Sequence, residues 1–232
     1  MPKFWSLISN GKYSVGCTGQ TVYIYDQNGA ELAKFKDLPY AYTAAFSPKG
    51  DIFAVKSTAG RLAVYSLKQL CLIQKFRFSK VDGSQDDNFC FSPDGERFYN
   101  IERHAKSYNT ALSVYRTSDF SLERRLFETD PKTELATVEF DPAVNDCYLL
   151  GFFRDDKNSA SEYFVAKLCG DELGDVKYIS EDTFDFYRGY KDMEAKGFTE
   201  QSKKWQTLKY LGYDLTDIET QKYSLTDLWR NH

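Results

Sequence analysis

The pattern Phe-Ser-Pro-x-Gly occurs twice in this sequence, at residues 46–50 and 91–95. Proline fixes φ at the first corner of a tight turn, serine can hydrogen-bond the main chain within it, and glycine tolerates a positive φ at its exit. Short apolar runs flank each motif, AYTAAF and DIFAVKST around the first and DNFCF and ERFYNIE around the second. Each motif therefore predicts the turn of an antiparallel hairpin, and the recurrence predicts a repeated β unit.

Each unit continues with a third and a fourth strand. These are RLAVYS and LCLIQKF in one copy and ALSVYR and SLERRLF in the next, while the chain start supplies TVYIYD and AELAKF. A looser copy reads TVEFDPAVNDCYLLGFF, EYFVAKL, the turn CGDELG and DVKYI. The centres of the third strands, Tyr25, Tyr65, Tyr115 and Ala166, are 40, 50 and 51 residues apart. Four short strands at this period indicate β-propeller blades and exclude a helical solenoid, whose segments would be long and follow a 3.6-residue rhythm.

The expected fold is mainly β, a small four-blade β-propeller with a C-terminal α-helical extension. We expect the propeller at residues 1–180 and the extension, packed on it, at 181–232. The blades are predicted at about 3–37, 41–78, 87–128 and 135–180. The sequence leaves open whether four blades close a ring, whether there is a fifth, or whether they form an open arc. The edges of an open arc would need cover from the tail, a second copy or a partner.

These motifs resemble WD-repeat propellers. The segments 46–51 and 91–96 look like that family's FSPDG-type turn. Ile24-Tyr25-Asp26, Val64-Tyr65-Ser66 and Val114-Tyr115-Arg116 stand where the family has its Trp-Asp ending. The resemblance covers about residues 3–180 and implies a degenerate WD-like β-propeller. The Gly-His pair and the Trp-Asp dipeptide are missing, so the family's buried hydrogen-bond tetrad is not encoded.

The last fifty residues follow a different pattern. Apolar residues at helical spacing after Thr199 predict a helix that ends at Gly212, and a capping box predicts another helix from Ser224. The segment EDTFDFYRGYKDMEAKG is a further candidate helix. Aromatic residues such as Trp205 and Trp229 need burial, either on the chain's own propeller or, as a docking helix, on another protein.

Charge and cysteine usage exclude several classes of protein. The net charge is −4, and no basic face of the kind that nucleic acid requires is evident. Five widely spaced cysteines, mostly in apolar runs, indicate free thiols in a reducing compartment rather than disulfides or zinc ligands. The N-terminal stretch lacks a signal-peptide core, and no run approaches the roughly 18 apolar residues of a membrane helix. We therefore expect a cytoplasmic protein without nucleic-acid or membrane partners.

No catalytic motif is present. The sequence has no GxSxG, HExxH, Walker or GxGxxG pattern, and its two histidines are His104 in a polar loop and the terminal His232. Acid–base chemistry by carboxylates alone remains open. The acidic clusters VDGSQDDN and FRDDKNS lack the spacing of a calcium-binding EF-hand loop. We expect no catalytic site, no metal and no cofactor.

The longest loops are predicted to share one end of the blades. In a four-strand meander, the second-to-third loops and the blade-to-blade connections lie opposite the hairpin turns, and SKVDGSQDD, RHAKSYNT and RDDKNSAS all belong to that set. Long loops on a rigid scaffold are common binding sites, although tolerated surface insertions give the same pattern. The candidate partner-binding residues are Asp82, Asp86, Asp87, Arg103, His104, Tyr108, Arg154, Asp155 and Asp156.

Three functional hypotheses follow. The first is a non-enzymatic protein-binding module with another protein, basic in charge, as its partner; an inhibitor or immunity-type protein is one form of it. The second is a hydrolase or lyase that uses carboxylates near the propeller axis. The third is an arc that completes another protein's propeller, and a homodimer through an open edge or the tail is a related expectation.

Overall fold

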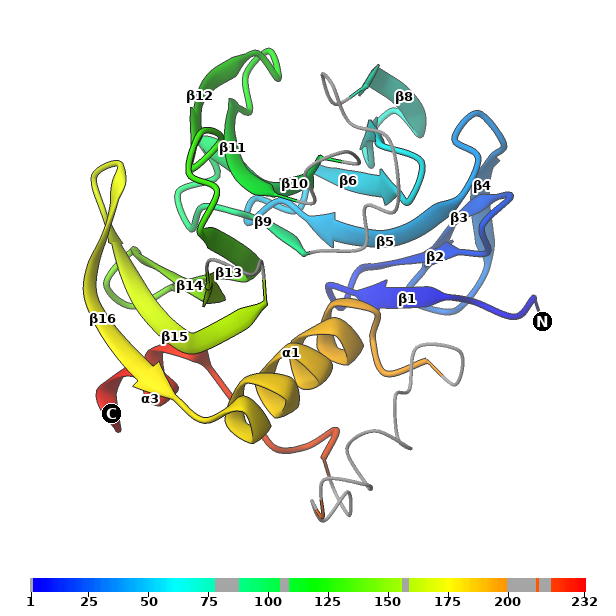
Figure 1. Ribbon diagram of the computed structural model, residues 1–232. Coiled ribbons are helices and arrows are strands. Elements are labelled where there is room, and N and C mark those ends of the chain that lie inside the picture. The colour runs from blue at the N-terminus through cyan, green and yellow to red at the C-terminus, as the bar shows by residue number, and fades with distance from the viewer. Residues whose placement is uncertain (1, 78–87, 105–108, 156–158, 200–211, 213–217) are drawn as a thin grey trace. The chain divides into compact units, whose positions relative to one another are not determined.

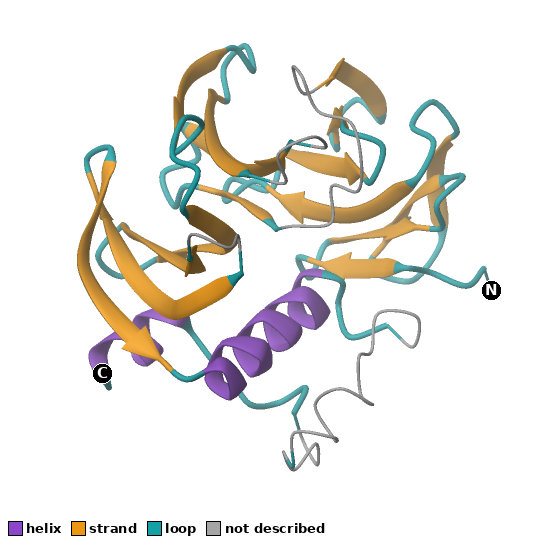
Figure 2. Ribbon diagram, in the orientation of Figure 1, coloured by secondary structure: helices purple, strands orange, loops and turns teal. Residues whose placement is uncertain are grey.

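The computed structural model describes residues 2–77, 88–104, 109–155, 159–199, 212 and 218–232. These residues form sixteen strands in four antiparallel sheets of four strands each, together with the helices α1 (Glu181–Ala195) and α3 (Leu225–Arg230). Figures 1 and 2 show the strands and helices along the chain. The mainly β fold, predicted from the repeat, and the C-terminal helical extension, predicted from the pattern of the last fifty residues, are confirmed.

The strands of each sheet follow one another in chain order, so each sheet is an antiparallel meander. Sheet 1 contains β1 (Ser6–Ser9), β2 (Tyr13–Cys17), β3 (Val22–Asp26) and β4 (Glu31–Phe35). Sheet 2 contains β5 (Ala41–Phe46), β6 (Ile52–Ser57), β7 (Arg61–Ser66) and β8 (Cys71–Arg77). Sheet 3 contains β9 (Phe89–Phe91), β10 (Arg97–Arg103), β11 (Thr110–Arg116) and β12 (Leu122–Leu126). Sheet 4 contains β13 (Thr133–Asp141), β14 (Asp146–Arg154), β15 (Ala160–Cys169) and β16 (Glu172–Ile179).

Each sheet has two different ends. The turns between its first and second and between its third and fourth strands lie at one end, which we call the turn end. The loop between its second and third strands lies at the opposite end, together with the connections to the neighbouring sheets in the chain, and we call this the connector end. The antiparallel order of the strands requires this division.

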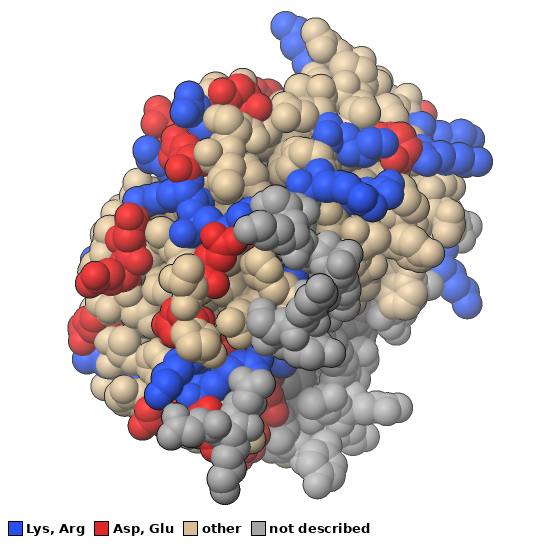
Figure 3. Space-filling view, turned by 45° about the horizontal axis from the view of Figure 1, so that its top comes forward, with Lys and Arg blue, Asp and Glu red and all other residues tan. Residues whose placement is uncertain are grey.

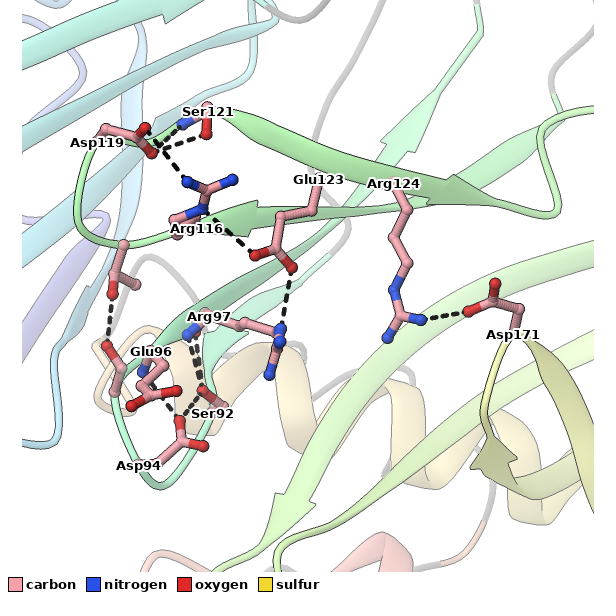
Figure 4. A network of polar contacts seen from close by, with 12 residues as sticks. Ser92, Asp94, Glu96, Arg97, Arg116, Asp119, Ser121, Glu123, Arg124 and Asp171 are labelled. Carbon is pink, nitrogen blue, oxygen red and sulfur yellow. Dashed lines mark hydrogen bonds and ion pairs between the residues drawn. The ribbon is translucent and has the colours of Figure 1, made fainter.

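The two Phe-Ser-Pro-x-Gly motifs form the predicted hairpin turns at the turn ends of sheets 2 and 3. Gly50 has φ +67° and Gly95 has φ +72°. In the second turn, the Gly95 N–H donates to the Ser92 carbonyl at 2.8 Å, and the Arg97 N–H donates to the Ser92 hydroxyl at 3.0 Å. That hydroxyl donates in turn to Asp94, as Figure 4 shows. Ser47 makes the equivalent bonds in the first turn.

The repeat is also visible in the backbone of the turns. A residue with positive φ stands in the first turn of every sheet: Gly11, Gly50, Gly95 and Asn145. The second turn of every sheet has one as well: Gly29, Leu70, Phe120 and Gly170. In sheet 4 this second turn is shorter than CGDELG suggests, because β16 already begins at Glu172. A left-handed residue allows such a two-residue hairpin loop.

Replacement of Ser92 tests whether the turn depends on its side chain. We expect Ser92→Ala to lower the free energy of unfolding by about 1 kcal/mol, because the Arg97 N–H loses its acceptor and the turn loses a side-chain bridge. Urea denaturation of the full chain measures this change. Ser121→Ala, at a partly exposed serine in the other turn of the same sheet, is the control and should change it by less than half as much. Equal losses in both variants would contradict this role of Ser92.

The chain divides into two compact units. Unit 1 comprises Met1–Asp86, His104–Lys106 and Asp192–Lys203, and unit 2 comprises Asp87–Arg103, Ser107–Lys191 and Lys204–His232. Sheets 1 and 2 belong to unit 1 and sheets 3 and 4 to unit 2. The boundary between the units falls within helix α1, between Lys191 and Asp192.

The core of unit 1 lies between sheets 1 and 2 and includes Val15 and Ile24 from one sheet and Phe53 and Tyr65 from the other. The Tyr65 ring stacks on Phe53 with ring centroids 5.0 Å apart, and its hydroxyl donates to Asp37 at 3.3 Å. The buried Tyr65 hydroxyl therefore has a carboxylate as its acceptor.

The segment after α1 lies along the edge strand β1 in unit 1. The Leu7 N–H donates to the Lys196 carbonyl at 3.1 Å, and the Thr199 hydroxyl donates to the Trp5 carbonyl at 2.8 Å. Gly197, with φ +65°, approaches β1 so closely that an added Cβ would lie 2.0 Å from the Leu7 carbonyl oxygen. This contact satisfies a backbone donor that an edge strand otherwise exposes.

In unit 2, both faces of sheet 4 carry apolar side chains that pack against other elements. Leu149 and Phe164 pack with residues of sheet 3, while Leu150 and Val165 pack with Phe184 of α1 and with α3. The helices therefore cover the face of sheet 4 that does not pack on sheet 3. Burial of this kind accounts for the aromatic residues of the described tail that pack on sheet 4, Phe184, Tyr187 and Trp229.

The predicted helix start at Ser224 is confirmed. Its hydroxyl accepts from the Asp227 N–H at 3.0 Å and caps α3. Trp229 of this helix packs against Tyr148, with ring centroids 5.6 Å apart, and its Nε1–H donates to the Asp175 carbonyl at 2.8 Å. The helix predicted after Thr199, with Trp205, lies outside the described residues.

Candidate functional site

The connector end of sheets 3 and 4 in unit 2 carries a buried ion cluster. Glu134, the second residue of β13, is only 1% exposed and binds two arginines. Its Oε1 accepts from Arg103 Nη1, and its Oε2 accepts from Arg154 Nη2 at 3.1 Å. Arg103 is the last residue of β10 and Arg154 is the last residue of β14. We call Arg103, Glu134 and Arg154 the clamp.

Strand pairing places the clamp. In the register of β13 and β14, Glu134 lies opposite Phe152. Phe152 precedes Arg154 by two residues on β14. Arg103 comes from sheet 3, where it pairs with Thr110. The Thr110 hydroxyl in turn accepts from the Leu135 N–H at 2.6 Å, so a second hydrogen bond joins the two sheets beside the clamp.

A second buried carboxylate lies next to the clamp residues in sequence. Glu102 is fully buried and accepts from the Tyr115 hydroxyl and from Arg125 Nη2, the latter at 3.1 Å. Asn100 Nδ2 donates to the same carboxylate at 3.4 Å. Burial, with a smaller contribution from the charge of Glu102, raises the pKa of the Tyr115 hydroxyl, which keeps it protonated as the donor.

Both oxygens of each carboxylate are occupied by donors. Burial raises the pKa of the Glu134 carboxyl, and the guanidinium groups of Arg103 and Arg154 act against that rise. A carboxylate held in this way positions its cationic partners rather than exchanging protons with a substrate. In the described ranges, no group of three or more His, Cys, Asp or Glu side chains is arranged to hold a metal ion.

The structure describes four of the nine predicted partner-binding residues. Arg103 and Arg154 meet at Glu134, whereas Asp155 is exposed in the loop after β14. The Asp155 carboxylate accepts from the Ser159 N–H at 2.8 Å. His104 is half-buried, and its Nε2 has no hydrogen-bond partner in the part of the chain that the structure describes. The other five, which lie outside the described residues, are Asp82, Asp86, Asp87, Tyr108 and Asp156.

Sequence reasoning did not identify Glu134 or Glu102. Glu102 is the one acidic residue of its strand, RFYNIER, and Glu134 shares the strand TELATVEFD with Glu139 and Asp141. An acidic residue inside an apolar strand is the sequence signal that could have identified them, because a buried carboxylate needs cationic partners.

The turn end of sheet 3 differs from the clamp. Arg97 and Arg116 both bind Glu123, at 2.9 and 3.5 Å, in side chains that are 42%, 54% and 24% exposed (Figure 4). Pairs this exposed contribute little to stability. They provide a comparison for the buried pairs at the connector end.

Comparison with known proteins identifies the fold but no family. No protein-family model matches the sequence, and no curated protein matches it either. Among solved structures, Kuenenia stuttgartiensis hydrazine synthase is 15% identical, with a TM-score of 0.61 over 78% of this chain and 50% of that one. The WD40 domain of Toxoplasma gondii coronin is 18% identical, with a TM-score of 0.57 over 76% of this chain and 45% of that one.

The dihydro-heme d1 dehydrogenase NirN in complex with DHE is 17% identical, with a TM-score of 0.50 over 75% of this chain and 34% of that one. This chain thus spans half or less of each of these three solved structures. At these identities the likeness concerns the fold alone, which is a β-propeller type built from four four-stranded sheets. This fold is compatible with a protein-interaction scaffold, and the same fold type also occurs in the two enzymes.

The helices in the described part of the chain lack the combination of length and hydropathy that characterises a membrane-spanning segment.

Proposed function

We propose that this chain is a non-enzymatic protein–protein interaction module, a degenerate WD-like propeller that binds its partner through the loops at the connector end of sheets 3 and 4. The observation that carries this proposal is the clamp. Arg103 and Arg154 are the residues from which the loops at 104–109 and 155–159 leave their strands, and one buried carboxylate binds both.

A binding loop benefits when the residues at its two ends are held in place. Loops that leave a rigid scaffold at defined points lose less conformational freedom on binding than loops with mobile ends, so more of the contact energy appears as affinity. The full occupancy of Glu134 and Glu102 favours this role over a carboxylate-dependent hydrolase or lyase.

The finer part of the proposal concerns the partner. A net charge of −4 and acidic residues in these loops, of which Asp155 is described, favour a basic protein. A cytoplasmic inhibitor or immunity-type protein that blocks a basic toxin or enzyme fits this size and charge.

Site-specific photo-crosslinking tests the proposal. A photoreactive phenylalanine analogue replaces Asp155 at the connector end or Val144, which is 54% exposed at the turn end of the same sheet. In lysate of the native cell, we expect a discrete adduct from position 155 that an excess of unmodified protein abolishes, and none from position 144. Equal adducts from both positions, or none from position 155, would contradict binding through the connector end.

A further inference from the structure

Two arginines lie opposite each other at the connector end of sheet 2 in unit 1. Arg61, the first residue of β7, is directly opposite Arg77, the last residue of β8. Like charges directly opposite each other on neighbouring strands destabilise a sheet. Neither guanidinium has an ion pair among the described residues, and Arg61 Nε is buried without a hydrogen-bond partner there.

The two strands that carry this pair, β7 and β8, contain no Asp or Glu, and the nearest acidic residues in sequence are Asp51 and Asp82. Residues 52–81 contain six Lys and Arg and no Asp or Glu, although the whole chain has an acidic excess. Lys75, on the same strand as Arg77, donates to the Asp37 main-chain carbonyl at 2.8 Å. The Asp37 carboxylate itself accepts from the Tyr65 hydroxyl. In Figure 3, the upper right of the face shows more blue, for Lys and Arg, than red, for Asp and Glu.

An exposed aromatic residue continues the row. Ala41, Ser57, Arg61 and Arg77 are successive partners across β5 to β8, and Tyr40 immediately precedes this row. Tyr40 is 60% exposed and has φ +58°, a left-handed conformation that is unfavourable for a bulky residue. The Thr58 N–H donates to the Tyr40 carbonyl at 3.2 Å and holds this conformation. We call Tyr40, Arg61 and Arg77 the arginine row.

We infer that the arginine row is a docking site for an acidic segment of a partner protein. A carboxylate placed between Arg61 and Arg77 would remove their mutual repulsion and form charge-assisted hydrogen bonds with their guanidinium groups. Tyr40 lies at the β5 end of this row, about two strand spacings or ~10 Å from Arg61 along the backbone, and its exposed ring offers apolar surface at that end. Tyrosine and arginine are also the residue types that dominate binding hot spots.

A peptide fits better than nucleic acid. The basic residues of the row are few, and a polyphosphate backbone would also meet the acidic excess of the rest of the chain. A carboxylate-bearing peptide needs only the local row. This inference is independent of the proposed role of sheets 3 and 4, because it concerns another unit of the chain.

Binding of a fluorescein-labelled decaglutamate peptide to the full chain, followed by fluorescence anisotropy at low salt, tests the inference. We expect Arg61→Gln/Arg77→Gln to weaken binding about tenfold or more, because two charge-assisted contacts are lost. The matched control is Lys49→Gln/Lys68→Gln, which removes the same charge from exposed residues at the turn end of the same sheet. It should weaken binding less than twofold.

Thermal unfolding separates loss of the site from loss of the fold. Because like charges are relieved, the melting temperature of the arginine variant should equal or exceed that of the unmodified chain, and Arg77→Gln alone, at an exposed side chain, should behave likewise. Equal weakening in both double variants, or absence of binding by the unmodified chain, would overturn the inference. Tighter binding of a ten-residue oligothymidylate than of decaglutamate would assign the row to phosphate and overturn it as well.

Discussion

Glu134→Ala is expected to lower the free energy of unfolding by about 3–5 kcal/mol, because it leaves two largely buried guanidinium groups without their carboxylate. The side chains of Arg103 and Arg154 are 22% and 12% exposed, so solvent replaces the lost partner poorly. Equilibrium denaturation in urea measures the change. Hydrogen exchange should also show faster exchange in residues 109–110 and 159–160, at the strand starts beyond the two loops.

The control is Glu123→Ala in the exposed network of Figure 4. It also removes a carboxylate that binds two arginines, but in partly exposed side chains, and should cost less than about 1 kcal/mol. If both variants lose the same stability, burial does not distinguish the clamp from a surface network. Glu134→Gln adds a second comparison, since it keeps the shape of the side chain and removes its charge.

Gly197→Ala is the second large expected effect, with a loss of about 3 kcal/mol or more. An added Cβ would lie 2.0 Å from the Leu7 carbonyl oxygen and 2.9 Å from the carbonyl carbon, both backbone atoms that cannot rotate away. The left-handed φ adds about 1–2 kcal/mol for a residue with a side chain. Urea denaturation measures the loss. The Leu7 amide, which donates to Lys196, should lose protection from hydrogen exchange.

Gly170→Ala separates the cost of the left-handed backbone conformation from the cost of the steric clash. Gly170 has nearly the same φ, +64°, and nothing within 4 Å of an added Cβ, so it tests the backbone conformation without the steric clash. We expect it to cost only about 1–2 kcal/mol. A loss in Gly197→Ala no greater than in Gly170→Ala would mean that β1 and the segment after α1 move apart at little cost.

Local sequence was sufficient for most of the fold. The turn motifs carry their own hydrogen bonds, as Ser47 and Ser92 show, and the capping box at Ser224 likewise needs only residues within one turn of helix. Such features depend on neighbours in sequence, so a pattern can reveal them. The division into two units has no such local signal.

The candidate site was predictable only in part. The loops marked the connector end, and Arg103 and Arg154 were identified because they flank those loops. Glu134 is 31 residues from Arg103 and 20 from Arg154, and its pairing depends on how sheets 3 and 4 pack. The arginine row was missed for a different reason. Recognising that Arg61 and Arg77 are opposite requires the register of β7 and β8, which includes an irregularity between Val64 and Tyr65.

The second turns of the four sheets differ in how well they would tolerate an insertion. In sheets 2 and 3 the left-handed position is filled by Leu70 and Phe120, whose side chains pack on apolar neighbours. In sheets 1 and 4 it is filled by Gly29 and Gly170, around which there is open space. A peptide tag or a fluorescent label inserted at these two glycines would therefore meet no packed side chain, which makes them suitable attachment points for following the protein in the cell.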